Sequence, residues 1–363
     1  MTAEPNLIEE LETFAQRDIR QRAEALRRVT DLFVASAGRF SNDQIGLFDE
    51  VMVRLVNQID ESARATFGRQ LAPVADAPPR LMRGLALDDS IEVAGPVLSQ
   101  SERLDEATLV EGARTKSQDH LLAISRRRVV DEPVTAVLAA RGDRTVVMST
   151  AANMGARFSD EGYSTMVERA RDDGELTLAM WVRPEIPRQH LLALFSQASE
   201  AVRQGLEAVD HARGGILQGV IAEASNRIQA GLREHSDVYT VARTKVMALH
   251  KEGKLNEAAL ARFAAENKFD ETTVTLSLLA DLPISVMERV VTNRRSEQIL
   301  VIAKAIGLSW ETTRSILLLH SGSRAGSNEE LDQNCDTFAR LNRDTAKKAI
   351  NFYRLRERAA TGT

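Results

Sequence analysis

Apolar residues recur at helical spacing along most of this chain, and short polar breaks separate them. Ser41 and Gln44 have the spacing of a capping box, and apolar side chains follow every three or four residues over residues 45–56. Over residues 77–198 the pattern comes in pairs, each an apolar helix, a polar break and a second helix that begins at a capping residue. The caps that we predict are Asp105, Asp131 and Ser159, with Pro187 in the first turn of its helix.

The polar breaks of these pairs recur at a nearly constant interval. Gln100, Arg127, Asn153 and Arg183 follow one another after 27, 26 and 30 residues. A period of this length, filled by two helices, is typical of stacked repeats in which each pair buries its apolar face against its neighbours. We therefore predict an N-terminal HEAT-like α-solenoid of short helical pairs over residues 1–198.

Residues 199–235 contain no proline and carry one apolar stripe, which runs from Val202 to Leu232. One continuous helix of this length would extend over roughly 50 Å, and Gly214 with Gly215 favours a bend in it. The stripe has two interpretations. It packs along the helical array, or it is a long connecting helix between two domains or a seam through which two copies form a homodimer. Residues 236–363 again show helical pairs and predict a C-terminal helical bundle. The fold expected for the whole chain is all-α.

Composition and charge reduce the number of protein classes to consider, but they do not identify the function. Aromatic residues make up only 4% of the chain and hydrophobic residues 43%, which favours helices with a substantial core. The net charge of −5 is unlike the basic excess of a general nucleic-acid binder. The single cysteine, the acidic start without a signal-peptide pattern and the lack of a long apolar run lead us to expect a cytoplasmic protein with no membrane partner.

Three stretches carry a resemblance to a known family. They are "LALDDSIEVAGPVLSQSERLDEATLVEGA", "KSQDHLLAISRR" and "IAKAIGLSWETTRSIL". They resemble signature stretches of domain-of-unknown-function family 2336, a family found chiefly in alphaproteobacteria, and the resemblance extends over about residues 50–355. It implies a fold of HEAT-like helical repeats and a bacterial cytoplasmic setting, and it implies no established activity.

Catalytic chemistry finds no support in the sequence. No phosphate-binding loop, dinucleotide-binding glycine pattern, nucleophile elbow or zinc-protease histidine pair occurs. His120 follows Ser117 in a predicted first helical turn, which favours a structural hydrogen bond, and Asp88 with Asp89 is predicted to cap a helix. We expect no enzyme activity, no metal site and no cofactor.

The stretch "LVIAKAIGLSWETTRSILLLH" is similar in outline to a DNA-reading helix-turn-helix. Gly307 matches the tight turn, and Ser309 can cap the second helix. A reading helix presents several polar or basic side chains to base edges. This second helix offers Arg314 and then an apolar block, so we interpret it as an ordinary helical hairpin.

Arginine and tryptophan at the breaks suggest a binding surface. Equivalent positions of a solenoid line one face, so Arg127, Asn153 and Arg183 are predicted to form a ladder beside Arg126 and Trp181, where acidic groups of a partner dock. The alternative is that these arginines make structural contacts with nearby carboxylates. We predict a non-enzymatic protein-interaction scaffold, plausibly regulatory or signalling. The alternatives are a nucleic-acid binder, through the ladder or the hairpin, and a sensor of an anionic small molecule such as a nucleotide second messenger.

Overall fold

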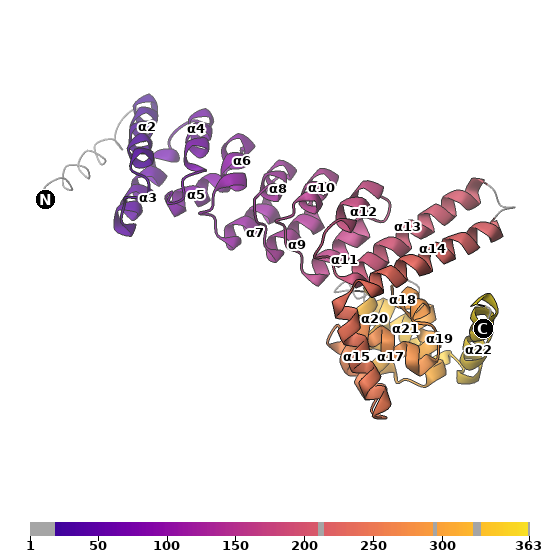
Figure 1. The fold of residues 1–363 in the computed structure, drawn as a ribbon. Coiled ribbons are helices and arrows are strands. Elements are labelled where there is room, and N and C mark those ends of the chain that lie inside the picture. Colours follow the sequence, from indigo (N-terminus) through magenta and orange to yellow (C-terminus); the bar gives the residue numbers. More distant parts are fainter. Residues whose placement is uncertain (1–18, 210–213, 293–295, 322–327, 362–363) are drawn as a thin grey trace. The chain divides into compact units, whose positions relative to one another are not determined.

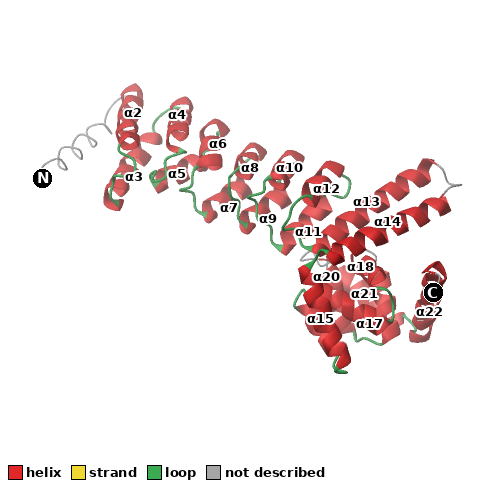
Figure 2. Cartoon of the chain, viewed as in Figure 1, coloured by secondary structure: helices red, strands yellow, loops and turns green. Residues whose placement is uncertain are grey.

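The computed structural model describes residues 19–209, 214–292, 296–321 and 328–361 (Figure 1). In these ranges the chain forms 21 helices and no strand, so the all-α prediction is confirmed (Figure 2). None of the helices in the described ranges has the length and apolar composition that crossing a membrane requires. The chain divides into two compact units, residues 1–166 and 167–363. The boundaries that the sequence suggests near residues 198 and 235 stay predictions.

Unit 1 consists of short helices that pack in two rows. Their bounds, in chain order, are α2 (Ile19–Ala35), α3 (Asn42–Val56), α4 (Glu61–Leu71), α5 (Pro79–Ala86), α6 (Ile91–Gln100), α7 (Glu106–Thr115), α8 (Gln118–Ser125), α9 (Glu132–Arg141) and α10 (Arg144–Ala152), and α11 (Asp160–Arg169) crosses the division. Helices α4, α6, α8 and α10 pack in sequence as one row, and α3, α5, α7 and α9 as the other (Figure 1). Each helix therefore packs on the one that comes two positions later in the chain.

Several helices of unit 1 begin where the sequence predicts. Ser41 and Gln44 form both hydrogen bonds of a capping box at α3, and the Asp105 carboxylate accepts a hydrogen bond of 2.8 Å from the Thr108 amide at α7. The Ser159 hydroxyl accepts from the Gly162 amide at the start of α11. Asp131 occupies the N-cap position of α9 without a side-chain cap hydrogen bond. These starts are predictable because a cap depends on residues only a few positions apart.

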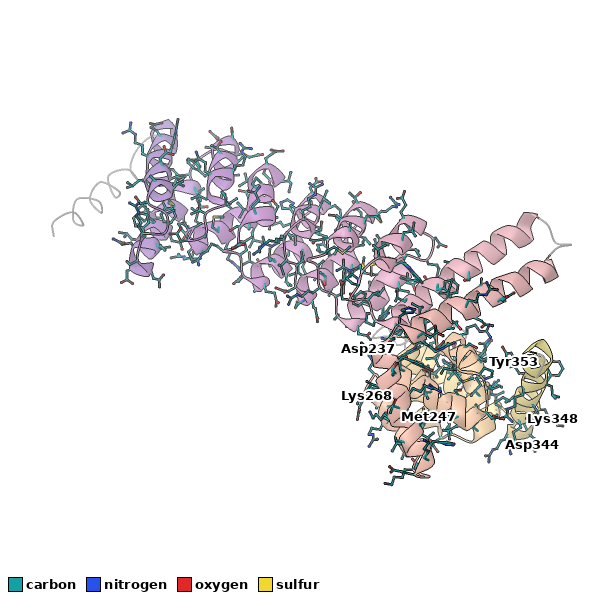
Figure 3. All side chains as sticks on the ribbon, in the orientation of Figure 1. Asp237, Met247, Lys268, Asp344, Lys348 and Tyr353 are labelled. Atoms are coloured by element: carbon teal, nitrogen blue, oxygen red, sulfur yellow. The ribbon has the colours of Figure 1, made fainter. Side chains whose placement is uncertain are left out.

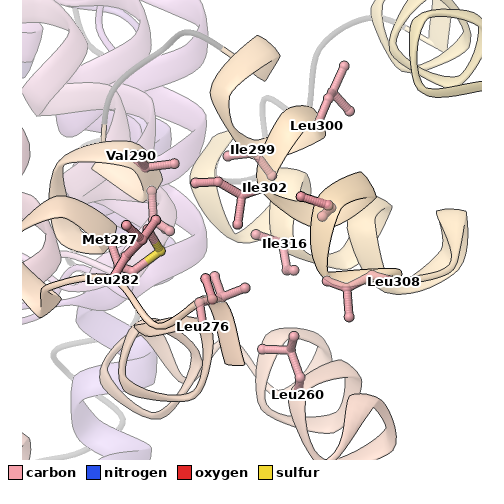
Figure 4. Close-up of a cluster of buried hydrophobic side chains, with 14 of the residues drawn as sticks. Leu260, Leu276, Leu282, Met287, Val290, Ile299, Leu300, Ile302, Leu308 and Ile316 are labelled. Carbon is pink, nitrogen blue, oxygen red and sulfur yellow. The ribbon is translucent and has the colours of Figure 1, made fainter. Parts of the chain in front are cut away.

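Unit 2 contains the remaining helices. Their bounds are α12 (Gly174–Trp181), α13 (Arg188–Val209), α14 (Gly214–Glu234), α15 (Asp237–Lys251), α16 (Glu257–Ala265), α17 (Phe269–Ala280), α18 (Ile284–Thr292), α19 (Ser296–Ile306), α20 (Trp310–Ser321), α21 (Asn328–Arg340) and α22 (Arg343–Thr361). Its core draws side chains from α16 to α22, and Figure 4 shows Leu276, Ile302 and Ile316 pointing toward one another from three of these helices. All three are less than a tenth exposed, so α17, α19 and α20 share one core.

In place of one continuous helix over residues 199–235, the chain forms the two helices α13 and α14, which pack against each other (Figure 1). Residues 210–213, between them, lie outside the described residues. Helix α14 begins at Gly214, the first of the paired glycines. Glycine is a poor residue for a helix interior because it loses the most conformational freedom there. The glycine pair thus falls at a helix end, where this cost is small.

A buried ion network anchors the base of this hairpin. Arg188 of α13 donates to Asp270 of α17 and to Glu288 of α18, and Arg233 of α14 donates to Glu288 over 2.6 Å. The Arg188 guanidinium also lies 4.7 Å from the centre of the Tyr239 ring of α15. Burial raises the pKa of Glu288 and of Asp270, against the lowering effect of Arg188. One carboxylate, that of Glu288, therefore fixes both helices of the hairpin to α18.

Candidate interaction surface

The predicted breaks lie at helix ends. Gln100 is the last residue of α6, and Asn153 follows α10 directly. Arg127 and Arg183 come two residues after the ends of α8 and α12. The interval found in the sequence is therefore the distance between the ends of alternate helices. Gln100 is exposed, whereas the other three residues have structural partners.

Arg127 directs its guanidinium into the protein. Its two terminal nitrogens donate to the carbonyl oxygens of Leu98, over 2.6 Å, and of Ser101, over 2.7 Å, at the C-terminal end of α6. A cation at this end of a helix satisfies free carbonyls and complements the helix dipole. Burial lowers the pKa of Arg127, against the raising effect of Glu102 and Asp131. The anionic group that Arg127 was predicted to bind is thus replaced by the protein's own backbone.

Asn153 caps the C-terminal end of α8, as Arg127 caps that of α6. Its amide nitrogen donates to the carbonyl oxygens of Ser125 and Arg127, over 2.8 and 2.7 Å. Arg141 of α9 makes the same kind of contact in the other row of helices. Its guanidinium donates to the carbonyl oxygens of Ala113 and Lys116 at the C-terminal end of α7. In unit 1, Arg127 and Asn153 of the predicted ladder therefore cap helix ends of the neighbouring pairs, which is the structural alternative that the sequence left open.

The backbone ties two consecutive breaks of unit 1 to each other. The Val130 amide donates to the Gly155 carbonyl over 3.1 Å, and the Arg157 amide donates to the Val130 carbonyl over 2.8 Å. These bonds form an isolated parallel bridge between Val130 and Ala156. A Cβ on Gly155 would lie 1.8 Å from the Arg128 carbonyl oxygen, so only glycine permits this approach. The two breaks form one ordered strip of backbone.

Exposed side chains project from this strip, and we call them the break edge: Arg126, Arg128, Val129, Met154 and Arg157. Met154 is 60% exposed and Val129 43% exposed, so both offer apolar contact area on ordered backbone. Arg128 pairs with Glu102 over 2.9 Å. Arg126 and Arg157 are exposed, and neither guanidinium has a hydrogen-bond or ion-pair partner in the described part of the chain. The break edge thus combines apolar contact area with two unpaired cations.

Of these five residues, only Arg126 was predicted from the sequence as a site residue. Val129 and Met154 could have been predicted as exposed contact residues, because both are apolar residues within polar breaks of the sequence. Arg157 gives no such signal. It joins the break edge only through the bridge that brings residues 155–157 against residue 130.

Arg183 and Trp181 belong to unit 2, and the structure corrects their expected exposure. The Arg183 side chain is fully buried, and its Nε donates to Glu185 over 2.8 Å. The Trp181 ring is partly buried, with its centroid 6.4 Å from that of Phe195. A buried guanidinium cannot dock a partner's acidic group without unfolding its surroundings. The large apolar residues near them that are exposed are Leu178 and Val182.

The helix-turn-helix-like stretch forms α19, a turn and α20. Gly307 has a φ of +84°, as the tight turn requires. Glu257 of α16 accepts hydrogen bonds from the Ser309 amide and the Thr312 hydroxyl, over 2.7 and 2.8 Å, and these bonds lower its pKa. Helix α16 therefore packs against the start of α20, and Glu257 places a carboxylate where this end would have to meet base edges.

His120 is almost fully buried, and both of its ring nitrogens are engaged. Its Nε2 donates to the Asp88 carbonyl over 3.0 Å, and its Nδ1 lies 2.7 Å from the Ser117 hydroxyl. These contacts join the start of α8 to the loop before α6, as expected of a structural residue. Across the described ranges, no group of three or more His, Cys, Asp or Glu side chains is arranged to hold a metal ion.

Comparison with known proteins places the chain within one family. A family model described as an uncharacterised protein conserved in bacteria (DUF2336) matches residues 93–351. No curated protein and no solved structure matches the chain. The matched range contains all five residues of the break edge.

Proposed function

The chain belongs to the bacterial family DUF2336, and from the residues that it exposes we propose that it is a non-enzymatic scaffold that binds another protein in the cytosol. The break edge of unit 1 is the observation that carries this proposal. Exposed apolar side chains on ordered backbone favour binding because little conformational freedom is lost when a partner covers them. Arginine adds bidentate recognition of carboxylates.

The partner best suited to the break edge is an acidic segment with apolar anchors. Val129 and Met154 offer apolar contact, and Arg126 and Arg157 offer unpaired guanidinium groups. Two-row packing of successive helix pairs also supports a HEAT-like solenoid, an architecture that provides extended surface without reactive groups. A regulatory or signalling role would suit such a surface. Binding of nucleic acid or of a nucleotide through Arg127 and Arg183 finds no support, because both guanidinium groups engage protein atoms.

Reversing the two unpaired charges is expected to abolish partner capture without unfolding the protein. The double variant Arg126→Glu with Arg157→Glu should keep the wild-type melting temperature and lose the proteins that the wild type captures from a lysate of its source bacterium, as identified by mass spectrometry. The matched control is Arg114→Glu, which reverses another exposed arginine of unit 1 whose guanidinium has no ion-pair partner among the described residues.

Arg127→Ala separates the binding proposal from a structural role. We expect this variant to melt at lower temperature, because two hydrogen bonds from a charged group are lost, each of about 1.5–3 kcal/mol. If the double variant Arg126→Glu with Arg157→Glu still captures the proteins that the wild type captures, the binding proposal is contradicted. An unchanged melting temperature for Arg127→Ala would contradict the capping role.

We also propose that the α13–α14 hairpin is a homodimer seam. Ile228, whose apolar side chain is 37% exposed, supports this, as does the apolar spacing from Val202 to Leu232 in the sequence. The side chains of residues 200–222 lie outside the described part of the structure. The variants Val220→Asp and Ile228→Asp are expected to remain helical by circular dichroism and to have half the wild-type mass in light scattering. A wild-type protein of monomer mass would contradict the seam.

A further inference from the structure

A groove of about 460 Å³ opens between α18, α19 and α22 of unit 2. Its walls are mainly aliphatic, and they include Val286, Val290, Val301, Ile302 and Ile350. Ligand sites in proteins commonly have volumes of about 300–1,000 Å³ and occur between helices of bundles. The groove therefore has the size and the lining of a site for an apolar ligand.

One cation belongs to this lining. Arg289 of α18 is half-buried, and in the described part of the chain its guanidinium has no hydrogen-bond or ion-pair partner. Other arginines of unit 2 that are as buried do have partners: Arg233 binds Glu288, and Arg354 binds the Ala280 carbonyl. Partly buried guanidinium groups usually have acceptors. Arg289 is thus available to an acceptor that a ligand brings.

Charge around the groove favours an anion. Over residues 343–355, where its side chains are described, helix α22 carries four basic residues and one acidic residue, whereas the whole chain has a net charge of −5. Glu297 also lines the groove, but its side chain is exposed and stays hydrated. An apolar wall beside an unpaired arginine suits a molecule with a hydrocarbon chain and one anionic end.

We propose that this groove binds a free single-chain carboxylate amphiphile, a fatty acid. The acyl chain lies along the walls formed by Val290, Ile302 and Ile350, and the carboxylate accepts hydrogen bonds from Arg289. Burial of each methylene group stabilises the complex, and the guanidinium fixes the orientation of the chain. The site is independent of the break edge, because it lies wholly within unit 2.

Titration calorimetry on the full chain tests the chemistry of the ligand. Decanoate should bind, whereas acetate, which lacks the chain, and decyltrimethylammonium, which carries the opposite charge, should bind at least about tenfold more weakly. Arg289→Leu should weaken decanoate binding roughly tenfold, the loss expected for a charge-assisted hydrogen bond. Arg314→Leu, at an exposed arginine of α20 outside the groove, should bind like the wild type.

A pair of tryptophan variants on α22 tests the location. Ala349 is exposed and lines the groove. Its neighbour Lys348, labelled on α22 in Figure 3, is exposed and is not part of the lining. Ala349→Trp should block decanoate, and Lys348→Trp should not, with both variants folded by circular dichroism. Decanoate binding that is absent, or equal in the two variants, overturns the proposal. Sedimentation of the chain with phosphatidylglycerol vesicles, without binding of free decanoate, overturns it in favour of a membrane surface.

Discussion

Replacing Glu288 by alanine is expected to destabilise unit 2 by about 3–5 kcal/mol, because removing one partner of a buried ion pair leaves the other charge uncompensated. Here two arginines lose their acceptor at once, since Arg188 and Arg233 both bind Glu288, whose side chain is fully buried. Asp270 would keep Arg188 partly paired, but Arg233 has no second carboxylate in the network among the described residues. The loss should be largest where α13 and α14 meet α18.

Thermal and urea denaturation of the full chain, followed by circular dichroism, measures this loss. Hydrogen exchange should rise first in the described parts of α13 and α14, because Glu288 is the shared anchor of both helices. The control is Glu311→Ala, which removes an exposed carboxylate of α20 and should change stability by less than about 0.5 kcal/mol. A Glu288→Ala protein as stable as this control would show that the network does not anchor the hairpin.

The network does not imply high stability of the native protein. Burial raises the pKa of Glu288 and of Asp270, which means that the charged forms are costly to desolvate. Such networks can be replaced as a whole by apolar residues with little loss. The network does fix geometry, because these ion pairs between two guanidinium groups and two carboxylates form in one arrangement of α13, α14, α17 and α18.

Gly155→Ala is expected to disrupt the break edge and to destabilise unit 1 by at least about 2 kcal/mol, the cost of overpacking together with weakened hydrogen bonds. The added Cβ would lie 1.8 Å from the Arg128 carbonyl oxygen, and backbone cannot move aside as a flexible side chain can. The bridge between Val130 and Ala156 should open. Partner capture should fall with it, because Met154 and Arg157 would no longer be fixed beside Arg128 and Val129.

Gly84→Ala is the matched control in the same unit. Gly84 lies inside α5, and a Cβ there would meet nothing within 4 Å. Alanine in a helix interior is more favourable than glycine by about 0.5–1 kcal/mol, so this variant should melt slightly higher than the wild type. Differential scanning calorimetry compares the two variants. A Gly155→Ala protein that melts with the wild type would mean that the two breaks are not held together as described.

Local patterns in the sequence were sufficient to predict where several helices of unit 1 begin and end. A cap requires an oxygen-bearing side chain a few residues before the amides that it satisfies, so Ser41, Asp105 and Ser159 could be recognised one by one. The interval between Gln100, Arg127 and Asn153 likewise predicted where α6, α8 and α10 end. Apolar spacing predicted an all-α chain because it repeats with the period of the helix.

The direction of the polar side chains at the breaks was decided only by the tertiary structure. Arg126 and Arg127 are neighbours in sequence, yet one is exposed and the other binds carbonyl oxygens at the end of α6. Those carbonyls lie 26 and 29 residues earlier in the chain, and no local pattern places them. The same holds for Arg157, which reaches the break edge only through the bridge at Val130. Composition and spacing therefore determined the helices and their order, while long-range hydrogen bonding to backbone groups left free at helix ends determined which arginines a partner can reach.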